Sequence, residues 1–95
     1  MKIEISAKEY ERTLNWNDGM MYCSLLVIDG KNDWRLPTKE ELNYIYNSKN
    51  DLHGLFYWSS TEYDYLYAWY QSFTIGYQDK YLKYTPRGIR PVRNI

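Results

Sequence analysis

The fold of this chain is decided around one stretch, Asp33-Trp34-Arg35-Leu36-Pro37-Thr38-Lys39-Glu40-Glu41-Leu42. Pro37 fixes the backbone ahead of a helix, and Thr38 followed by Glu41 has the pattern of a capping box, in which each residue satisfies a backbone N–H near the other. The next apolar positions recur at helical spacing: Leu42, Ile45 and Tyr46. A polar cluster after residue 46 ends the pattern, so a helix is predicted over residues 38–47.

An earlier helix is indicated upstream of this stretch. Asn15 can cap its N-terminus, with Asp18 at the third helical position. Gly30 is placed to adopt a left-handed conformation beyond its end, which predicts a helix over residues 16–28. The apolar face of that helix contains Trp16, Met20, Cys23 and Val27.

Short strands flank and follow the two helices. Residues 2–6 alternate between apolar and polar side chains, as an edge strand does. Aromatic runs separated by turn residues predict four more strands, at 56–60, 67–74, 80–84 and 88–93. Gly76 is expected in a hairpin turn, and Pro86-Arg87-Gly88 is expected to interrupt the strands. The prediction is an α+β domain with a twisted, mostly antiparallel sheet, whose termini lie side by side if the first strand pairs with the last.

Length and composition describe one small domain, over residues 1–95, that is rich in aromatic side chains. Twelve acidic and twelve basic residues give zero net charge, which argues against a nucleic-acid binder that relies on overall charge. Aromatic residues make up 19% of the chain, with 12 Tyr, so part of this aromatic surface is expected to face outward. The predicted core contains Trp16, Met20, Cys23, Val27, Trp34, Leu36, Leu42, Ile45, Trp58 and Trp69.

Few residues have the chemistry of a catalytic or metal site. Cys23 is the only cysteine and His53 the only histidine, which excludes an intramolecular disulfide, a thiolate cluster and a multi-histidine centre. The hydroxyls at 59–61 have no base implied by spacing. Two acidic groupings supply too few oxygens for calcium: Asn32-Asp33, and Glu62 with Asp64. We expect no enzymatic activity, no cofactor and no metal.

No stretch of the sequence has the apolar length of a signal peptide or a transmembrane helix. A soluble, cytoplasmic protein is therefore expected. Incorporation into a phage virion assembled in the cytoplasm is the alternative that we keep.

Six blocks in order resemble the Lcl C-terminal domain family, named for a bacterial collagen-like adhesin. The front blocks are Asn15-Trp16 together with Tyr22-Cys23, then residues 33–38, and then Glu41-Leu42. The back blocks are residues 57–61, Ala68-Trp69 with Phe73 and Gly76, and residues 89–93. The resemblance implies a C-type lectin-like fold with paired terminal strands and a ligand surface of irregular loops. The same broad fold includes formylglycine-generating oxidases, which need a pair of active-site cysteines that this chain does not have.

The candidate ligand-binding residues lie in two tyrosine-rich segments. In the family that the chain resembles, these segments flank the exposed ligand surface, and Tyr suits both protein hot spots and sugar stacking. The predicted contact residues are Tyr63, Asp64, Tyr65, Tyr67, Tyr77, Gln78, Lys80, Tyr81 and Lys83. The five tyrosines among them are expected to be exposed and to form one continuous patch, with both lysines at its rim.

A local charge of +5 near the C-terminus has two interpretations. The last sixteen residues contain five basic residues and no acid: Lys80, Lys83, Arg87, Arg90 and Arg93. Arg90 and Arg93 can form structural ion pairs in the closing motif, or the whole set can form a basic strip for a sulfated glycan or phosphate.

The sequence as a whole favours a non-catalytic recognition module from a bacterium or a phage. Its expected partner is a protein or a glycan, with no specific nucleic acid and no membrane. A homo-oligomer is compatible with exposed aromatic surface, so a self-assembling virion decoration subunit is one alternative function. A degenerate relative of the formylglycine-generating oxidases is the other.

Overall fold

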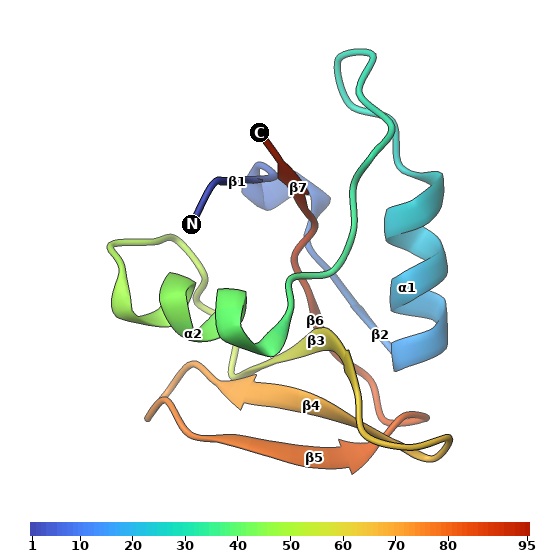
Figure 1. Cartoon of the computed structure of the whole chain (residues 1–95), viewed down its shortest axis with the longest axis vertical. Coiled ribbons are helices and arrows are strands. Elements are labelled where there is room, and N and C mark those ends of the chain that lie inside the picture. Colours follow the sequence, from blue (N-terminus) through green and yellow to red (C-terminus); the bar gives the residue numbers. More distant parts are fainter.

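The computed structural model describes residues 1–95 and confirms the α+β class (Figure 1). The helices are η1, a short 3-10 helix at Lys8–Tyr10, α1 at Trp16–Leu25 and α2 at Lys39–Asn47. The strands are β1 (Ile3–Ile5), β2 (Arg12–Leu14), β3 (Phe56–Glu62), β4 (Tyr67–Ser72), β5 (Gln78–Leu82), β6 (Arg87–Ile89) and β7 (Val92–Asn94). No helix has the length and apolar character needed to span a membrane.

Two sheets organise the strands. β1 and β7 pair antiparallel, which brings the two ends of the chain together as the sequence predicted (Figure 1). The larger sheet has the order β2-β6-β3-β4-β5, and only its β3–β6 pair is parallel. β5 is an edge strand of this sheet, and in Figure 1 it lies on the far side of the molecule from both termini.

Both predicted helix starts are confirmed by their capping bonds. The Asp18 N–H donates to Asn15 Oδ1 at 2.9 Å. The Thr38 hydroxyl accepts from the Glu41 N–H at 3.1 Å, and the Glu41 carboxylate accepts from the Thr38 N–H at 2.9 Å. These reciprocal bonds satisfy backbone donors that a helix start leaves without partners.

The predicted end of the first helix is wrong, because α1 stops at Leu25. Asp29 and Gly30 both adopt positive φ, 51° and 80°, and form a two-residue turn between Ile28 and Lys31, which bond to each other. Asp-Gly is a favoured pair for such turns, since both central residues must be left-handed. Gly30 therefore has the predicted conformation, but in a projecting hairpin rather than at a helix end (Figure 1).

The larger sheet separates two apolar clusters. Trp16, Cys23, Leu36, Trp58, Ala68, Tyr70 and Ile89 form the cluster on the α1 side. Leu42, Ile45, Leu52, Tyr57 and Val92 form the cluster on the α2 side. Adjacent strand residues such as Tyr57 and Trp58 enter opposite clusters, because successive side chains of a strand point to opposite faces.

Three of the ten predicted core residues are not in the core. Met20 is 36% exposed, because Trp16, Gly19 and Cys23 form the buried face of α1 and Met20 lies at its edge, and Val27 is exposed because the helix has already ended. Trp69 is half-buried, since its β4 position faces a part of the sheet that α2 only partly covers. The other seven predicted core residues are buried.

The C-terminal strands also differ from the prediction. Residues 88–93 form two strands in different sheets, β6 and β7, because Arg90-Pro91 lies between them. The proline there has no N–H to donate to a ladder. Arg87 and Gly88 belong to β6 instead of interrupting the strands. One of the two partners of β6, the three-residue strand β2, was not predicted.

Candidate ligand-binding surface

The tyrosine-rich segments occupy the β3–β4 loop and the edge strand β5. All five predicted contact tyrosines are exposed, from 36% for Tyr67 to 83% for Tyr65. Asp64 shapes the loop, because its Oδ1 accepts the N–H groups of Leu66 and Tyr67, both at 2.8 Å. This is the side-chain-to-backbone bonding by which Asp stabilises tight turns.

The five tyrosines do not form the one continuous patch that was predicted. In the β4–β5 register Trp69 is opposite Lys80 and Ala68 is opposite Tyr81. Because side chains alternate along each strand, Trp69 and Lys80 lie on the α2 face of the sheet, while Tyr81 lies on the α1 face. Tyr63 packs on Trp69, and Tyr77 packs on Tyr70, so the tyrosines are divided between the two faces.

Tyr65 packs neither with Tyr63 and Trp69 on the α2 face nor with Tyr70 and Tyr77 on the α1 face. It lines a third region, an open cavity of about 400 Å³ shared with Tyr84 and the start of α1 at Asp18. Its phenol is the most exposed of the five, since the tip of the β3–β4 loop carries it away from the sheet.

Four residues on the α2 face form what we call the Trp69 surface: Lys39, Tyr63, Trp69 and Lys80. The Tyr63 and Trp69 rings meet edge to face at 6.5 Å. Lys39 Nζ lies 3.9 Å from the centre of the Trp69 ring, and Lys80 Nζ lies 4.9 Å from it and 4.7 Å from the Tyr63 ring. Ammonium groups at these distances are attracted to the negative faces of the rings.

The backbone of Lys39 is fixed over this surface by two strands. Its N–H donates to Thr61 Oγ1 at 3.0 Å, and its carbonyl accepts from Gln78 Nε2 at 2.6 Å. Gln78 Nε2 also donates to Gln71 Oε1 at 3.0 Å. The predicted contact residue Gln78 thus joins α2 to the sheet and positions Lys39. The Ser59 hydroxyl on β3 donates to the backbone carbonyl of Trp69 at 2.6 Å, so this hydroxyl also fixes the position of Trp69.

Lys83 is wrongly predicted as a rim residue. Lys83 is 7% exposed, and its Nζ bonds Glu62 at 2.5 Å. The same Nζ lies 4.4 Å from the centre of the Trp16 ring. Burial of an ammonium is tolerated only where a carboxylate or aromatic ring compensates for lost water. Lys83 therefore connects the end of β3 to the start of α1 instead of facing a ligand.

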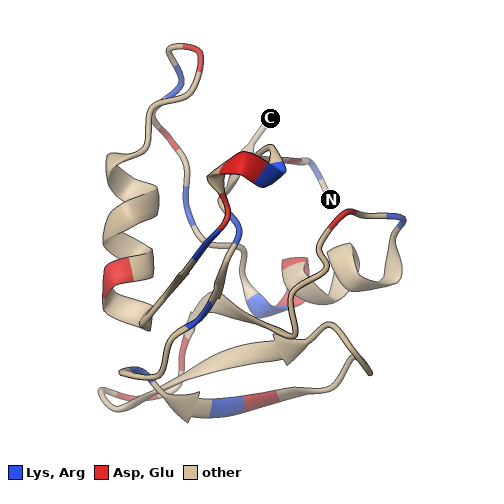
Figure 2. Ribbon diagram, turned by 180° about the vertical axis from the view of Figure 1, so that it is seen from behind, with Lys and Arg blue, Asp and Glu red and all other residues tan.

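The basic strip near the C-terminus is largely neutralised by ion pairs. Arg93 bonds Asp33 at 2.6 Å and Glu4 at 3.0 Å. Lys83 and Arg90 are paired as well, so Arg87 and Lys80 are the members without a carboxylate. Figure 2 shows the result on the ribbon, where acidic and basic residues are interspersed.

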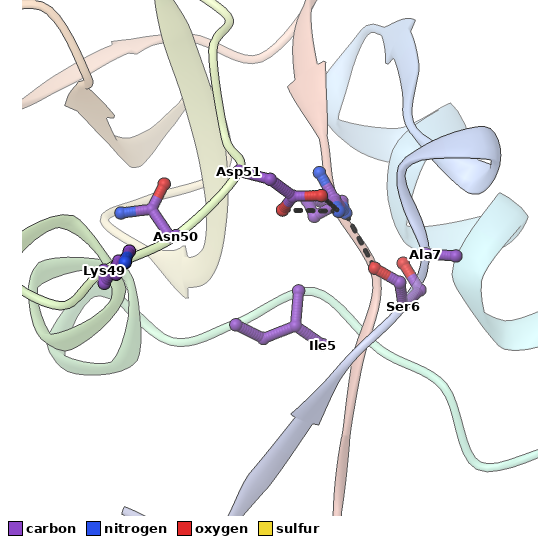
Figure 3. A pocket seen from close by; sticks show the side chains of 7 residues that line it. Ile5, Ser6, Ala7, Lys49, Asn50 and Asp51 are labelled. Carbon is purple, nitrogen blue, oxygen red and sulfur yellow. Dashed lines mark hydrogen bonds and ion pairs between the residues drawn. The ribbon is translucent and has the colours of Figure 1, made fainter.

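The largest cavity, of about 510 Å³, is built around Arg90. The Arg90 guanidinium donates to both Asp51 oxygens at 2.8 and 2.9 Å and to the Ser6 carbonyl at 2.9 Å. Figure 3 labels Asp51 and Ser6, and its dashed lines mark bonds at both residues. Arg90 Nη1 bonds Glu11 at 3.0 Å. Hydrogen bonding to Arg90 lowers the pKa of Asp51. These contacts connect distant segments, so the geometry of this cavity is that of a structural clamp.

The remaining reactive groups are not gathered into a site. Cys23 is 1% exposed, and burial raises the pKa of its thiol to about 12. No three His, Cys, Asp or Glu side chains lie close enough to hold a metal ion together. His53 lies exposed in the loop that precedes β3.

Sequence reasoning missed two members of the Trp69 surface. Trp69 was assigned to the core, although its alternation with the buried Ala68 and Tyr70 along β4 indicates that it points to another face. Lys39 gave no signal, because only the docking of α2 on the sheet brings it to Trp69.

Comparison with known proteins identifies the family. No match was found among curated proteins. The family model of the Lcl C-terminal domain matches residues 4–93, which include both helices and all but the first and last residues of the paired terminal strands. The chain therefore belongs to the Lcl C-terminal domain family.

Proposed function

We propose that this domain is a non-catalytic recognition module that binds a glycan or a protein through the Trp69 surface. The observation that carries the proposal is a partly exposed indole flanked by Tyr63 and two ammonium groups that form no ion pair. An aromatic platform with polar groups at its edge suits a sugar ring or a protein hot spot, because it buries flat apolar area at low entropic cost.

The charges of the Trp69 surface favour ligands with acidic or hydroxyl groups. Lys39 and Lys80 keep their hydrogen-bond donors available beside the rings, since no carboxylate occupies them. Rim charges of this kind act mainly on association rate and its dependence on salt. The exposed aromatic rings and the unpaired lysines therefore support the recognition function that the sequence favours.

Capture by the immobilised domain tests the proposal. The domain is exposed to a glycan array and to bacterial lysate, as wild type, Tyr63→Ala and Tyr44→Ala. Tyr44 on α2 is the matched control, because its exposure of 46% is close to the 56% of Tyr63. Unlike Tyr63, it takes part in no aromatic pair. We expect Tyr63→Ala to weaken binding by about 2 kcal/mol or more, the hot-spot range, with Tyr44→Ala unchanged.

Retention of full binding by Tyr63→Ala would exclude the Trp69 surface as the ligand site. A comparison of melting temperatures keeps the test valid, because truncating an exposed side chain should leave stability nearly unchanged.

Self-association is the second candidate function, and the outer side of α1 favours it. Met21 and Leu25 lie one turn apart on this helix and are 60% and 74% exposed, and Val27 beyond it is 62% exposed. Apolar groups gathered on one side of a monomer mark contact sites. Light scattering on wild type and Leu25→Glu tests this candidate. Self-association requires that the wild type forms an oligomer and that the charge introduced at position 25 dissociates it.

A further inference from the structure

Arg87 differs from the other four arginines of the chain because its guanidinium has no hydrogen-bond acceptor. Arg12 donates to the backbone carbonyls of Glu9 and Glu11. Arg35, Arg90 and Arg93 each bond a carboxylate. None of the six ion pairs involves Arg87, and its Nε is buried without a partner. An unsatisfied buried donor costs free energy, so its retention calls for a physical explanation.

Aromatic rings from three strands hold this guanidinium in place. Its central carbon lies 4.3 Å from the centre of the Tyr70 ring, 4.4 Å from Phe56 and 4.5 Å from Tyr81. The side chain thus leaves β6 and contacts rings that β3, β4 and β5 present on the α1 face of the sheet. Stacking on aromatic faces suits the planar guanidinium and restricts its rotamers before any ligand arrives.

The surroundings of Arg87 leave room for a ligand. Tyr77 and Tyr81 are each 44% exposed, and Tyr77 packs on Tyr70. A cavity of about 260 Å³ adjoins this group, with Phe56 and Arg87 in its lining. Glu11 also lines the cavity, but its carboxylate already accepts bonds from Arg90 and Tyr57. Asp79 lies between Tyr77 and Tyr81 on the exposed edge strand and forms no ion pair.

We propose that Phe56, Tyr70, Tyr77, Tyr81 and Arg87, the Arg87 surface, bind a carboxylate side chain of an acidic protein segment. The guanidinium supplies planar donors that match a carboxylate, and the rings supply apolar area for the neighbouring peptide. The single guanidinium matches the single charge of a carboxylate, and Asp79, which lies opposite Tyr70 on the same face of the sheet, repels a doubly charged phosphate more strongly than a carboxylate. The site lies on the opposite face of the sheet from the Trp69 surface, so it does not depend on the function proposed above.

Nuclear magnetic resonance of the arginine side chains tests this proposal on the wild-type domain. The probes are a capped pentapeptide with a central glutamate between two leucines, its glutamine counterpart, and inorganic phosphate. We expect the Arg87 Nε–H signal to shift saturably with the glutamate peptide, and the glutamine peptide to bind at least about tenfold more weakly. The Arg12 Nε–H signal is the internal control and should not move.

Two variants extend the test without relying on the wild-type signal alone. Arg87→Lys keeps the charge but loses the planar donors, so it should bind the glutamate peptide at least about fivefold more weakly. Arg12→Lys should bind as wild type does. Equal binding of both peptides, an unmoved Arg87 signal, or saturation by phosphate at lower concentration than by the glutamate peptide would overturn the proposal.

Discussion

Single arginines connect segments of this chain that are distant in sequence or lie on different elements. Arg90 is 2% exposed and joins the segment after β1 to the loop after α2, through Ser6 and Asp51. Arg35 bonds both oxygens of Glu41, at 2.7 and 2.9 Å. Bidentate pairs of this kind fix geometry as well as charge. Arg35 and Arg90 therefore have structural roles, whereas the Arg87 guanidinium has no hydrogen-bond acceptor.

Removing Arg90 should destabilise the domain strongly. Arg90→Met leaves Glu11 and Asp51 without their cation, and we expect the free energy of unfolding to fall by about 3 kcal/mol. Arg12→Met should change it by less than about 0.5 kcal/mol, because Arg12 is a surface residue. Urea unfolding of both variants measures this difference, and equal effects would show that Arg90 is not a structural clamp.

The thiol of Cys23 should be inert in the folded domain. Burial against the α1-side cluster raises its pKa to about 12, so almost no thiolate exists near neutral pH. Ellman's reagent at about pH 8 should label the urea-unfolded chain rapidly and the native domain only as fast as it unfolds. Rapid labelling of the native domain would contradict the position of this side chain in the core.

At the scale of elements, short-range signals were predicted well, whereas the pairing of β1 with β7 was the one long-range strand pairing that was expected. The capping residues Asn15 and Thr38 act within one helical turn, so the sequence reveals both helix starts. β2 has three residues and pairs only with β6, near the other end of the chain, so no local pattern indicates it. The division of the tyrosines between two faces depends on the β4–β5 register, which the sequence alone does not define.

The first turn of α2 should make stability depend on pH. Hydrogen bonds from Arg35 lower the pKa of Glu41 below its ordinary value of 4.5. The stabilisation by the ionised Glu41 carboxylate is fully present at pH values above the pKa of Glu41 in the unfolded chain. It is lost as the pH falls through the lower pKa of Glu41 in the folded domain. The unfolding free-energy difference between wild type and Glu41→Gln should be constant above about pH 6 and shrink towards about pH 3. A difference that grows on acidification would contradict this account.

Close contact between β6 and β3 should make Gly88 intolerant of a side chain. A Cβ at this position would lie 2.8 Å from the Phe56 carbonyl oxygen and 2.8 Å from the Tyr57 ring. We expect Gly88→Ala to cost about 2 kcal/mol or more. Gly30→Ala is the control for backbone conformation alone, at about 1 kcal/mol, because nothing lies within 4 Å of its Cβ position. Thermal unfolding should rank Gly88→Ala as the more destabilised.

At the scale of the whole molecule, one sheet presents two different aromatic surfaces. The Trp69 surface carries lysines on the α2 face, and the Arg87 surface carries a stacked guanidinium on the α1 face. Both are built on β4 and β5, which lie away from the paired termini (Figure 1). The ligands proposed for the two surfaces would therefore contact opposite faces of the sheet.

The tryptophans offer the most direct test of the central claim, that ligand binds at the Trp69 surface. Trp16, Trp34 and Trp58 are buried, and Trp69 alone is partly exposed. The domain is labelled with 5-fluorotryptophan, and its fluorine spectrum is recorded with and without the captured ligand. We predict that the Trp69 signal, assigned with Trp69→Phe, shifts most. An unmoved Trp69 signal in the saturated complex would contradict the claim.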